Sequence, residues 1–364
     1  MSIFPVGDAL PRVRGRGRRI GWILIVVAVI GAVIVGQLPA SYVIEEPGPV
    51  YNTLGTTKVD SKTVPVLSIS GAKTYPTSGA LDMLTVNLNG DPVNRPNWSE
   101  IVTAYLDPSK AVTPIAEIYA PQETVGQSNK EGAREMLDSQ QQATAAALFE
   151  QHIAFTSSVT VDSTQKGSPA AAELRAGDVL KAVNGKTFVD ADQLRTLILA
   201  NGTHKPMTMA FTRKGVHQVA QITPEATKTG PFLGVFLFEA YKFPFPVKVQ
   251  LQDVGGPSAG MMFALGIIDK LTPGELTGGK HVAGTGTISA FGVVGAIGGI
   301  RQKLYGARAA GATYFLAPAS NCDEVRGHIP AGLTVFATST LHQSVLDLKA
   351  IAAGQGLNKL KTCG

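Results

Sequence analysis

Cysteine, charge and aromatic side chains are all scarce in this sequence. Its 364 residues include two cysteines and six histidines. The histidines are scattered and neither an HExxH nor a CxxC motif occurs, so the residues predict no metal site. Charged residues make up only 16% of the chain and aromatic residues 7%. No basic stripe carries interleaved aromatic residues, so we expect no nucleic-acid partner.

The net charge of +5 is concentrated at the N-terminus, where residues 1–19 form a basic tail with five arginines. An uncharged stretch follows over 20–36 and, with its shoulders, has about the length of a membrane-spanning helix. The positive-inside rule then predicts a single-pass protein of the cell membrane. Its tail would be cytoplasmic, its transmembrane helix would cover 20–40 in the lipid bilayer, and the rest would be extracytoplasmic. A cleaved signal peptide is the alternative, although 20–36 is long for one.

The two cysteines fit this arrangement. Cys322 and Cys363 both lie in the part expected to be exported, where thiols are oxidised. We therefore predict a disulfide that ties down the C-terminal tail. The alternative is two unpaired thiols, because sequence does not show whether their Cα atoms come within bridging distance.

Residues 41–154 form the first extracytoplasmic segment. Its early part has short extended stretches, such as 64–70 and 84–88, broken by proline and glycine. A longer stretch over 130–152 is rich in alanine and glutamine, which predicts a helix with Ser128 or Asn129 as its N-cap.

Residues 155–225 change character. A β-like run leads into GSPAAAELRAGDVLKAVNG, then a helix-like DADQLRTLILANG and two further β-like runs. The order and wording resemble a PDZ domain, and the resemblance implies a β-rich module that captures an extended peptide along a strand edge. No Gly-Leu-Gly-Phe-type loop occurs near Phe155, so the ligand stays open. The alternative is a module that only packs against its neighbour.

Residues 230–364 carry the chemistry. The motif GPSAG places Ser258 at the start of an apolar run to residue 271, which predicts a buried helix. A helix N-terminus offers free N–H groups to a developing oxyanion, but it is also where serine commonly serves as an N-cap. The pattern Gly-x-Ser-x-Gly matches a nucleophile elbow as well, with Asp323 and His328 or His342 in triad order. We reject the elbow because 253–257 reads as a loop rather than a strand.

The same segment resembles the proteolytic domain of Lon-type proteases. Five motifs occur in the same order as in that family: GPSAG, an apolar helix, TGTI, GVVGAIGGIRQK, and LYGARAAGATYFLAP. The resemblance implies that Ser258 is the nucleophile, Lys303 its base and Thr285 the residue that orients the lysine amine. Supporting positions around the nucleophile are Gly256, Pro257, Ala259 and Gly260. Lysine can serve as the base only if burial lowers its pKa, and the apolar residues that flank Lys303 favour this.

Departures from the family pattern are mild, the main one being Thr287 where the family has an acidic residue. The stretch 274–280 imitates a phosphate-binding loop but is followed by His281 instead of serine or threonine, so we expect neither ATP nor another cofactor. Because 230–364 is short for such a domain, we expect part of 41–154 to complete it. The best candidate is 75–88.

Together these patterns predict an α+β protein with one transmembrane helix, a PDZ-like domain and a Lon-type α/β proteolytic domain. The predicted function is an ATP-independent serine endopeptidase that cleaves proteins or peptides outside the cytoplasm. A non-catalytic peptide-binding scaffold and a Ser-His-Asp hydrolase are the alternatives. Substrate identity and oligomerisation stay open.

Overall fold

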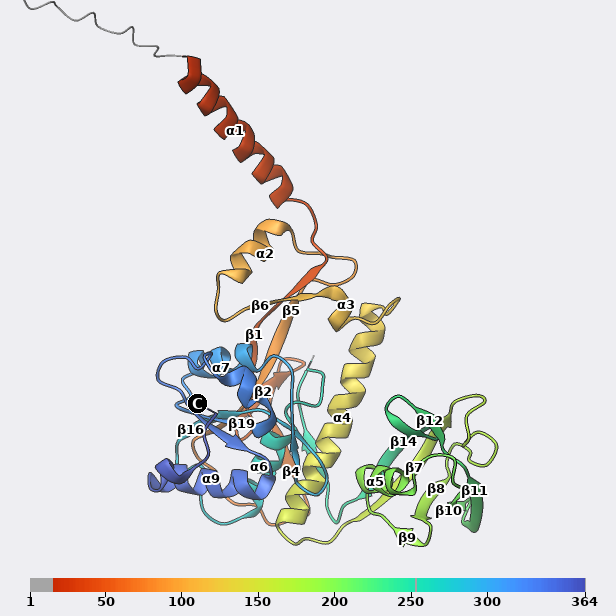
Figure 1. The fold of residues 1–364 in the computed structure, drawn as a ribbon. Helices are drawn as coiled ribbons and strands as arrows, with labels where there is room; N and C mark the ends of the chain where they lie inside the picture. The colour runs from red at the N-terminus through yellow and green to blue at the C-terminus, as the bar shows by residue number, and fades with distance from the viewer. Residues whose placement is uncertain (1–15, 253, 364) are drawn as a thin grey trace, which may run out of the picture. The chain divides into compact units, whose positions relative to one another are not determined.

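The computed structural model describes residues 16–252 and 254–363 (Figure 1). The chain divides into two compact units. Unit 1 comprises the chain up to Gly48 together with Val86–Ser128, and unit 2 comprises Pro49–Thr85 and Asn129–Gly364.

Unit 1 holds a short antiparallel pairing and small helices around a few apolar side chains. Tyr42–Glu45 of strand β1 pairs with strand β6. The core consists of Ala40, Ile44, Ile101 and Ala104. The elements of this unit are α1 (Arg16–Gly36), β1 (Tyr42–Asn52), α2 (Trp98–Tyr105), β6 (Ala111–Pro114) and α3 (Ile115–Ile118).

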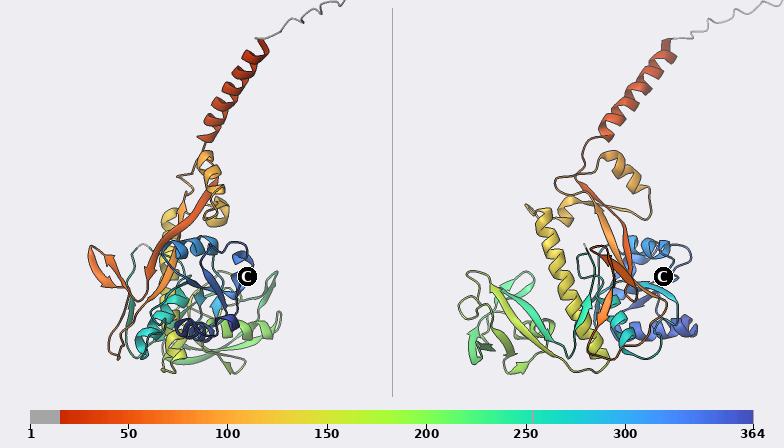
Figure 2. Two further views of the ribbon diagram at one scale, coloured as in Figure 1. Left: turned by 90° about the vertical axis from the view of Figure 1, so that its left-hand side faces the viewer. Right: turned by 180° about the vertical axis from the view of Figure 1, so that it is seen from behind.

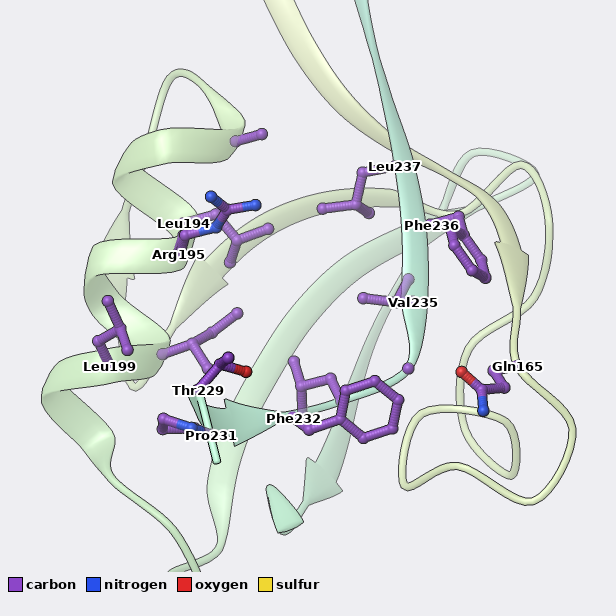
Figure 3. A pocket seen from close by; sticks show the side chains of 14 residues that line it. Gln165, Leu194, Arg195, Leu199, Thr229, Pro231, Phe232, Val235, Phe236 and Leu237 are labelled. Carbon is purple, nitrogen blue, oxygen red and sulfur yellow. The ribbon is translucent and has the colours of Figure 1, made fainter. Parts of the chain in front are cut away.

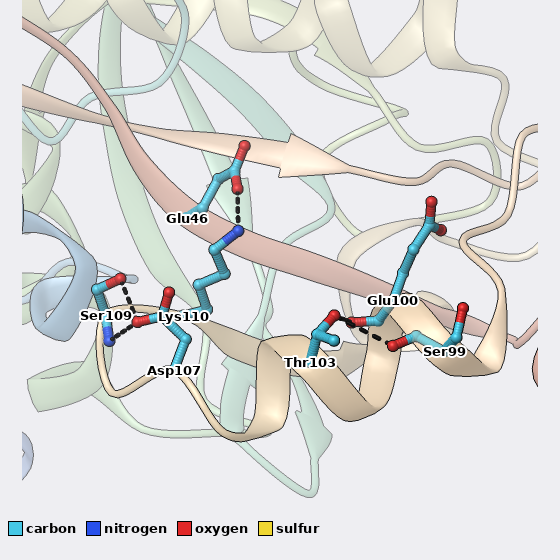
Figure 4. Close-up of polar contacts among 7 residues, drawn as sticks. All are labelled: Glu46, Ser99, Glu100, Thr103, Asp107, Ser109 and Lys110. Carbon is cyan, nitrogen blue, oxygen red and sulfur yellow. Dashed lines mark hydrogen bonds and ion pairs between the residues drawn. The ribbon is translucent and has the colours of Figure 1, made fainter.

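Local polar contacts explain where α2 begins. The side chain of Asn97 accepts a hydrogen bond from the Glu100 backbone N–H, and the Glu100 carboxylate accepts one from the Asn97 N–H. This reciprocal capping box satisfies two of the N–H groups that a helix start leaves free. Nearby, Lys110 and Glu46 form an ion pair with 2.8 Å between Nζ and Oε2 (Figure 4).

The predicted transmembrane helix over 20–40 is wrong. Within residues 16–252 and 254–363, no helix combines the length and the apolar character that a bilayer crossing requires. Helix α1 ends at Gly36, so its uncharged part spans about 26 Å at 1.5 Å per residue, short of the roughly 30 Å hydrocarbon core. The membrane part of the predicted fold class and the predicted cell-membrane localisation are therefore wrong as well. The tail 1–15 lies outside the described residues.

The main sheet of unit 2 is parallel. Its strands follow the order β20-β19-β16-β5, and β5 pairs in parallel with β16 through Ala80–Met83. The segment 75–88, which we expected to complete the proteolytic domain, thus contributes a strand to this sheet. The four strands are β5 (Ala80–Asn89), β16 (His281–Gly284), β19 (Tyr314–Pro318) and β20 (Thr334–Thr338).

Successive side chains of these strands belong alternately to two apolar cores, one on each face of the sheet. Val282, Leu316 and Phe336 belong to one apolar cluster with helices α6 and α9, whereas their neighbours Ala283 and Phe315 belong to another with helix α7. Successive side chains of a strand point to opposite faces, so the sheet is covered on both sides. The helices are α6 (Gly260–Leu271), α7 (Ile300–Ala309), α8 (Cys322–Val325) and α9 (Leu341–Ala353), with 3-10 turns η1 (Ala319–Asn321) and η2 (Leu357–Lys359).

Helix α4 (Val125–Glu150) adds alanines to the first of these cores. It begins five residues before the predicted start at Lys130, so neither Ser128 nor Asn129 is its N-cap. Thr124 explains the earlier start, because its Oγ1 accepts from the Gln127 N–H while the Gln127 side chain accepts from the Thr124 N–H. This is again a capping-box arrangement.

A second sheet follows α4 along the chain, in the order β11-β10-β8-β7-β14, with helix α5 (Ala191–Asn201). It encloses its own apolar core. The strands are β7 (Thr156–Thr164), β8 (Val179–Val183), β9 (Lys186–Thr187), β10 (Met207–Arg213), β11 (Val216–Ile222) and β14 (Val235–Lys242). Strand β14 lies beyond residue 225, the predicted end of this module.

Short pairs complete the fold. The β2–β3 hairpin stands out at the left of the first view in Figure 2. The pairs are β2 (Thr56–Val59) with β3 (Lys62–Pro65), β4 (Leu67–Ile69) with β15 (Val247–Val249), β12 (Glu225–Thr227) with β13 (Gly230–Phe232), and β17 (Thr287–Ile288) with β18 (Val294–Gly295). The described chain is a mixed α/β structure.

Candidate active site and peptide groove

Ser258 lies in the loop between β15 and α6, two residues before the helix begins. Ala259 is the N-cap of α6, and it makes no side-chain cap hydrogen bond. The serine is half-buried. Its hydroxyl is therefore not used to cap the helix, and it lies at the end where free N–H groups and the helix dipole favour negative charge.

Lys303 approaches this hydroxyl from helix α7. Its Nζ lies 2.9 Å from Ser258 Oγ and 3.2 Å from Thr285 Oγ1. The lysine is only 3% exposed. Lys303 lies on the buried side of α7 together with Ile300 and Leu304, which pack into the second core of the sheet and so hold the lysine in place.

Burial gives this lysine the character of a base. Loss of hydration lowers the pKa of Lys303 from 10.5 to about 8, and the negative charge of Glu324 opposes part of that fall. A lysine amine with a pKa near 8 is neutral in a substantial fraction of molecules at mildly alkaline pH. A neutral amine can accept the proton of a serine hydroxyl, which a weak nucleophile such as serine requires.

Thr285 connects the two groups. It is 1% exposed, and its Oγ1 accepts a hydrogen bond from Lys303 Nζ while donating one of 2.9 Å to the backbone oxygen of Ser258. A hydroxyl has one proton to donate and lone pairs to accept, so both bonds form together. The Gly286 N–H donates to the same Ser258 oxygen at 2.8 Å. The serine backbone and the lysine amine are thereby held by one residue.

The two glycines beside Ser258 are needed for different reasons. Gly256 has φ +84°, a left-handed conformation that favours glycine. A Cβ at Gly260 would lie 2.8 Å from Ile288 Cγ2 and 2.9 Å from Ser139 Oγ, so only glycine fits where α6 starts. Pro257 is exposed and Ala259 is buried. The supporting residues thus shape the loop rather than offer reacting groups.

The segment that carries Ser258 and Lys303 is similar to known proteins. Residues 252–349 match the Lon protease (S16) C-terminal proteolytic domain. "Lon protease 2" of Herpetosiphon aurantiacus is 38% identical over 91 residues, which cover 24% of this chain and 11% of that protein. "Lon protease" of Clostridioides difficile is 41% identical over 75 residues, which cover 21% and 9%. The chain spans about a tenth of the length of these relatives.

Residues 135–211 match the PDZ domain. Among solved structures, the PDZ domain of the SdrC-like protein from Listeria monocytogenes aligns at 26% identity with a TM-score of 0.21, covering 22% of this chain and 85% of that one. Its counterpart from Listeria innocua aligns at 24% identity and a TM-score of 0.21, covering 22% and 92%.

The chain contains a Lon proteolytic domain and a PDZ domain. The Lon matches support a serine peptidase.

Residues of the alternative triad have other partners. Asp323 is 91% exposed in its side chain and pairs with Arg326. His328 Nδ1 lies 3.0 Å from the Glu324 backbone oxygen, and His342 Nδ1 lies 2.8 Å from Glu150 Oε1. Among the interactions of the described residues, the Ser258 hydroxyl bonds to Lys303.

A disulfide joins Cys322 to Cys363, with Cα atoms 4.7 Å apart. The residue before Cys322, Asn321, holds the loop before α7. The Asn321 side chain accepts from the Ile297 N–H at 3.0 Å and donates to the Ile297 oxygen at 2.8 Å. Both bonds orient the turn from which the lysine helix starts.

The PDZ domain has an open groove between α5 and β14 (Figure 3). The cavity has a volume of about 680 Å³. Leu194 projects from the helix, and Val235 and Leu237 project toward it from the strand, while Phe236 between them points the other way and is 57% exposed. Strand β14 ends the order of its sheet, so an extended peptide can pair with its free edge.

The loop that leads into the groove strand does not lie near Phe155, where the sequence was expected to show it. It lies at Leu233-Gly234, directly before β14, and both residues line the groove. Gly234 has φ +68°, and a Cβ at that position would lie 2.2 Å from Ser168 Cβ. An apolar residue and a glycine directly before an alternating strand are the signal that could have found it.

Proposed function

We propose that this chain is a serine endopeptidase in which Ser258 attacks a peptide carbonyl with Lys303 as its base. The observation that carries the proposal is the 2.9 Å contact between Lys303 Nζ and Ser258 Oγ, made by a lysine that is 3% exposed. Burial lowers the pKa of that lysine to about 8, which makes it a base at the pH where peptidases work.

The reaction has two halves. Ser258 Oγ bonds to the carbonyl carbon while its proton moves to Lys303 Nζ, and the carbonyl oxygen becomes an oxyanion. Lys303 then gives this proton to the departing amine as the C–N bond breaks, which leaves an acyl ester on Ser258. Water attacks the ester with Lys303 again taking the proton, and the acid product leaves as Ser258 regains its hydrogen.

Thr285 serves this cycle by orientation. Its hydroxyl contacts both the lysine amine and the Ser258 backbone oxygen, so the amine stays directed at Oγ in each half of the reaction. Its burial protects these bonds from competition with water. Gly256, Pro257, Ala259 and Gly260 shape the loop that presents the serine.

The groove of the PDZ domain supplies the proposed recruitment step. An extended peptide would pair its backbone with the edge of β14 and place apolar side chains against Leu194 and Leu237. Protein or peptide substrates are therefore the class that both domains fit.

We further propose that cleavage needs no ATP. The support comes from the sequence, because 274–280 imitates a phosphate-binding loop but is followed by His281 instead of the serine or threonine whose hydroxyl binds magnesium. Cleavage by the purified chain should then be equal with and without ATP and magnesium. A rate that rises more than about tenfold with nucleotide would contradict this.

The decisive experiment compares peptide cleavage by the wild-type chain with that by Ser258→Ala and Lys303→Ala. Each variant should lose at least about 10³-fold in kcat/KM, since the dyad acts as a unit. His328→Ala and His342→Ala are the matched controls and should keep wild-type rates. If both dyad variants keep activity, or if a histidine variant loses it, the proposal is wrong.

A further inference from the structure

Helix α4 contacts the loop that carries the nucleophile at two points. Gly132 accepts a hydrogen bond of 2.8 Å from the Gly256 N–H through its backbone oxygen. Ser139 donates a hydrogen bond of 2.9 Å from its Oγ to the backbone oxygen of Pro257. The two helix residues are seven positions apart, which is two turns, so they lie on one face of α4.

The contact at Gly132 is close. A Cβ on Gly255 would lie 3.1 Å from the Gly132 carbonyl carbon, so the loop and the helix backbone meet with almost no side chain between them. The Gly256 N–H is engaged by this contact. It therefore cannot also stabilise an oxyanion, and because Pro257 has no N–H, the next groups along the chain that could do so are the N–H groups of Ser258 and Ala259.

The contact at Ser139 fixes the peptide that ends at the nucleophile. The C=O of Pro257 and the N–H of Ser258 belong to one planar trans peptide and point in opposite directions. Holding the Pro257 oxygen against α4 therefore directs the Ser258 N–H away from α4. On its other side, the Ser258 oxygen is held by Thr285 and Gly286, so both peptide units that flank the serine Cα are held.

We propose that Ser139 is a positioning residue for the nucleophile, acting through the Pro257 carbonyl. Ser139 is 3% exposed and lies 119 positions before Ser258 in the chain, on a helix that the sequence does not associate with GPSAG. Its role is to set the orientation of the Ser258 backbone, which decides both the direction of Oγ and the direction of the adjacent N–H. The inference rests on the proposed peptidase function of Ser258.

The test uses the full chain with Ser139→Ala and the matched control Thr144→Ala. Thr144 is a buried hydroxyl of the same helix whose Oγ1 donates to the Gln140 oxygen. Two rates are measured: peptide cleavage, and labelling of Ser258 by a fluorophosphonate, which needs the serine but no peptide. Melting temperatures of both variants are recorded alongside.

Ser139→Ala should lower kcat and the labelling rate about 10- to 100-fold, because small displacements of a reacting group have effects of that size. KM should stay within about twofold, the pH midpoint should not move, and the melting temperature should match that of Thr144→Ala. If Ser139→Ala labels and cleaves like Thr144→Ala, or if KM changes instead of kcat, the inference is wrong.

The experiment distinguishes a failure of the proposed peptidase function from a failure of the role proposed for Ser139. A wild-type chain that is labelled at Ser258 yet cleaves no peptide would overturn the peptidase proposal, while the labelling rates would still decide the role of Ser139. Conversely, inactive Ser258→Ala and Lys303→Ala beside a fully active Ser139→Ala would leave the peptidase proposal intact and overturn the positioning role.

Discussion

The proposed catalytic site of the Lon domain and the groove of the PDZ domain differ in their exposure to solvent. Lys303 and Thr285 are almost fully buried and hydrogen-bonded to each other. The groove beside β14 is open, with exposed side chains such as Leu199 along its rim. The difference follows from what each must do: a lysine base needs desolvation to lower its pKa, whereas an extended peptide needs an unpaired strand edge.

The largest expected contrast is in pH dependence. Lys303 must be neutral to accept a proton, and its pKa is lowered to about 8, so kcat/KM should rise about tenfold per pH unit below 8 and level off above it. Peptide binding to the groove, measured by fluorescence polarisation, should stay nearly constant over the same range. Glu324→Gln removes the charge that raises this pKa, so it should move the midpoint to lower pH. A midpoint that stays in place would contradict that electrostatic account.

Loss of the disulfide should affect the Lon domain more than the groove. The bond closes a loop with a sequence separation of 41, and its removal in Cys322→Ser/Cys363→Ser should cost about 3–4 kcal/mol of unfolding free energy. Urea unfolding of the double variant measures this cost. Cleavage should also fall, because Asn321 beside Cys322 orients the turn before α7. Equal losses of cleavage and of groove binding would remove the distinction.

A charge placed in the groove should weaken peptide binding to the PDZ domain and leave the Ser258 site of the Lon domain unaffected. Ile198→Glu places a carboxylate among apolar side chains of the groove and should weaken binding of a library-selected peptide by about tenfold or more. Val219→Glu, on an exposed position of β11 outside the groove, is the control. Labelling of Ser258 by a fluorophosphonate should be unchanged in both. Peptide binding that survives in Ile198→Glu would place the ligand elsewhere.

The smallest expected effect is on stability and concerns a buried carboxyl group that has no role in the proposed function. Asp347 is 3% exposed and its Oδ2 has no partner among the described residues, so burial raises its pKa to about 6. Between pH 4 and 6 the unfolded chain ionises this group while the folded chain keeps the proton, so the folded state loses stability as pH rises. Asp347→Asn should remove this loss and stabilise the protein by about 1–2 kcal/mol at pH 7.

Thermal unfolding at pH 4 and pH 8 measures this difference. Asp323→Asn, whose side chain is 91% exposed, is the control and should keep the wild-type pH dependence. An Asp347→Asn variant with the same dependence as wild type would show that this carboxyl does not carry it.

Short motifs in the sequence were enough to predict part of the candidate site. GPSAG and GGIRQK lie forty-five positions apart, and both the pairing of Ser258 with Lys303 and the role expected of Thr285 follow from their resemblance to one family. The extended stretch 84–88 was also recognisable from its patterning, and it lies within strand β5. These features are short-range, so composition and order reveal them.

The N-terminal helix shows where such patterning misleads. An uncharged run after a basic tail is typical of a membrane span, yet the uncharged part of the helix ends at Gly36 and is too short for a crossing. The uncharged run continues through Gln37 to Leu38 and Pro39, but hydropathy does not determine where the helix ends.

The sequence by itself determined which groups we propose to react, because Ser258 and Lys303 lie in motifs that resemble those of one family. Only the tertiary structure decided what supports them: α4 against the nucleophile loop, Asn321 against the turn before α7, and Gly234 at the end of the peptide groove. These contacts join segments far apart in the chain through backbone groups. Backbone donors and acceptors are the same at every residue, so only folding reveals which of them meet.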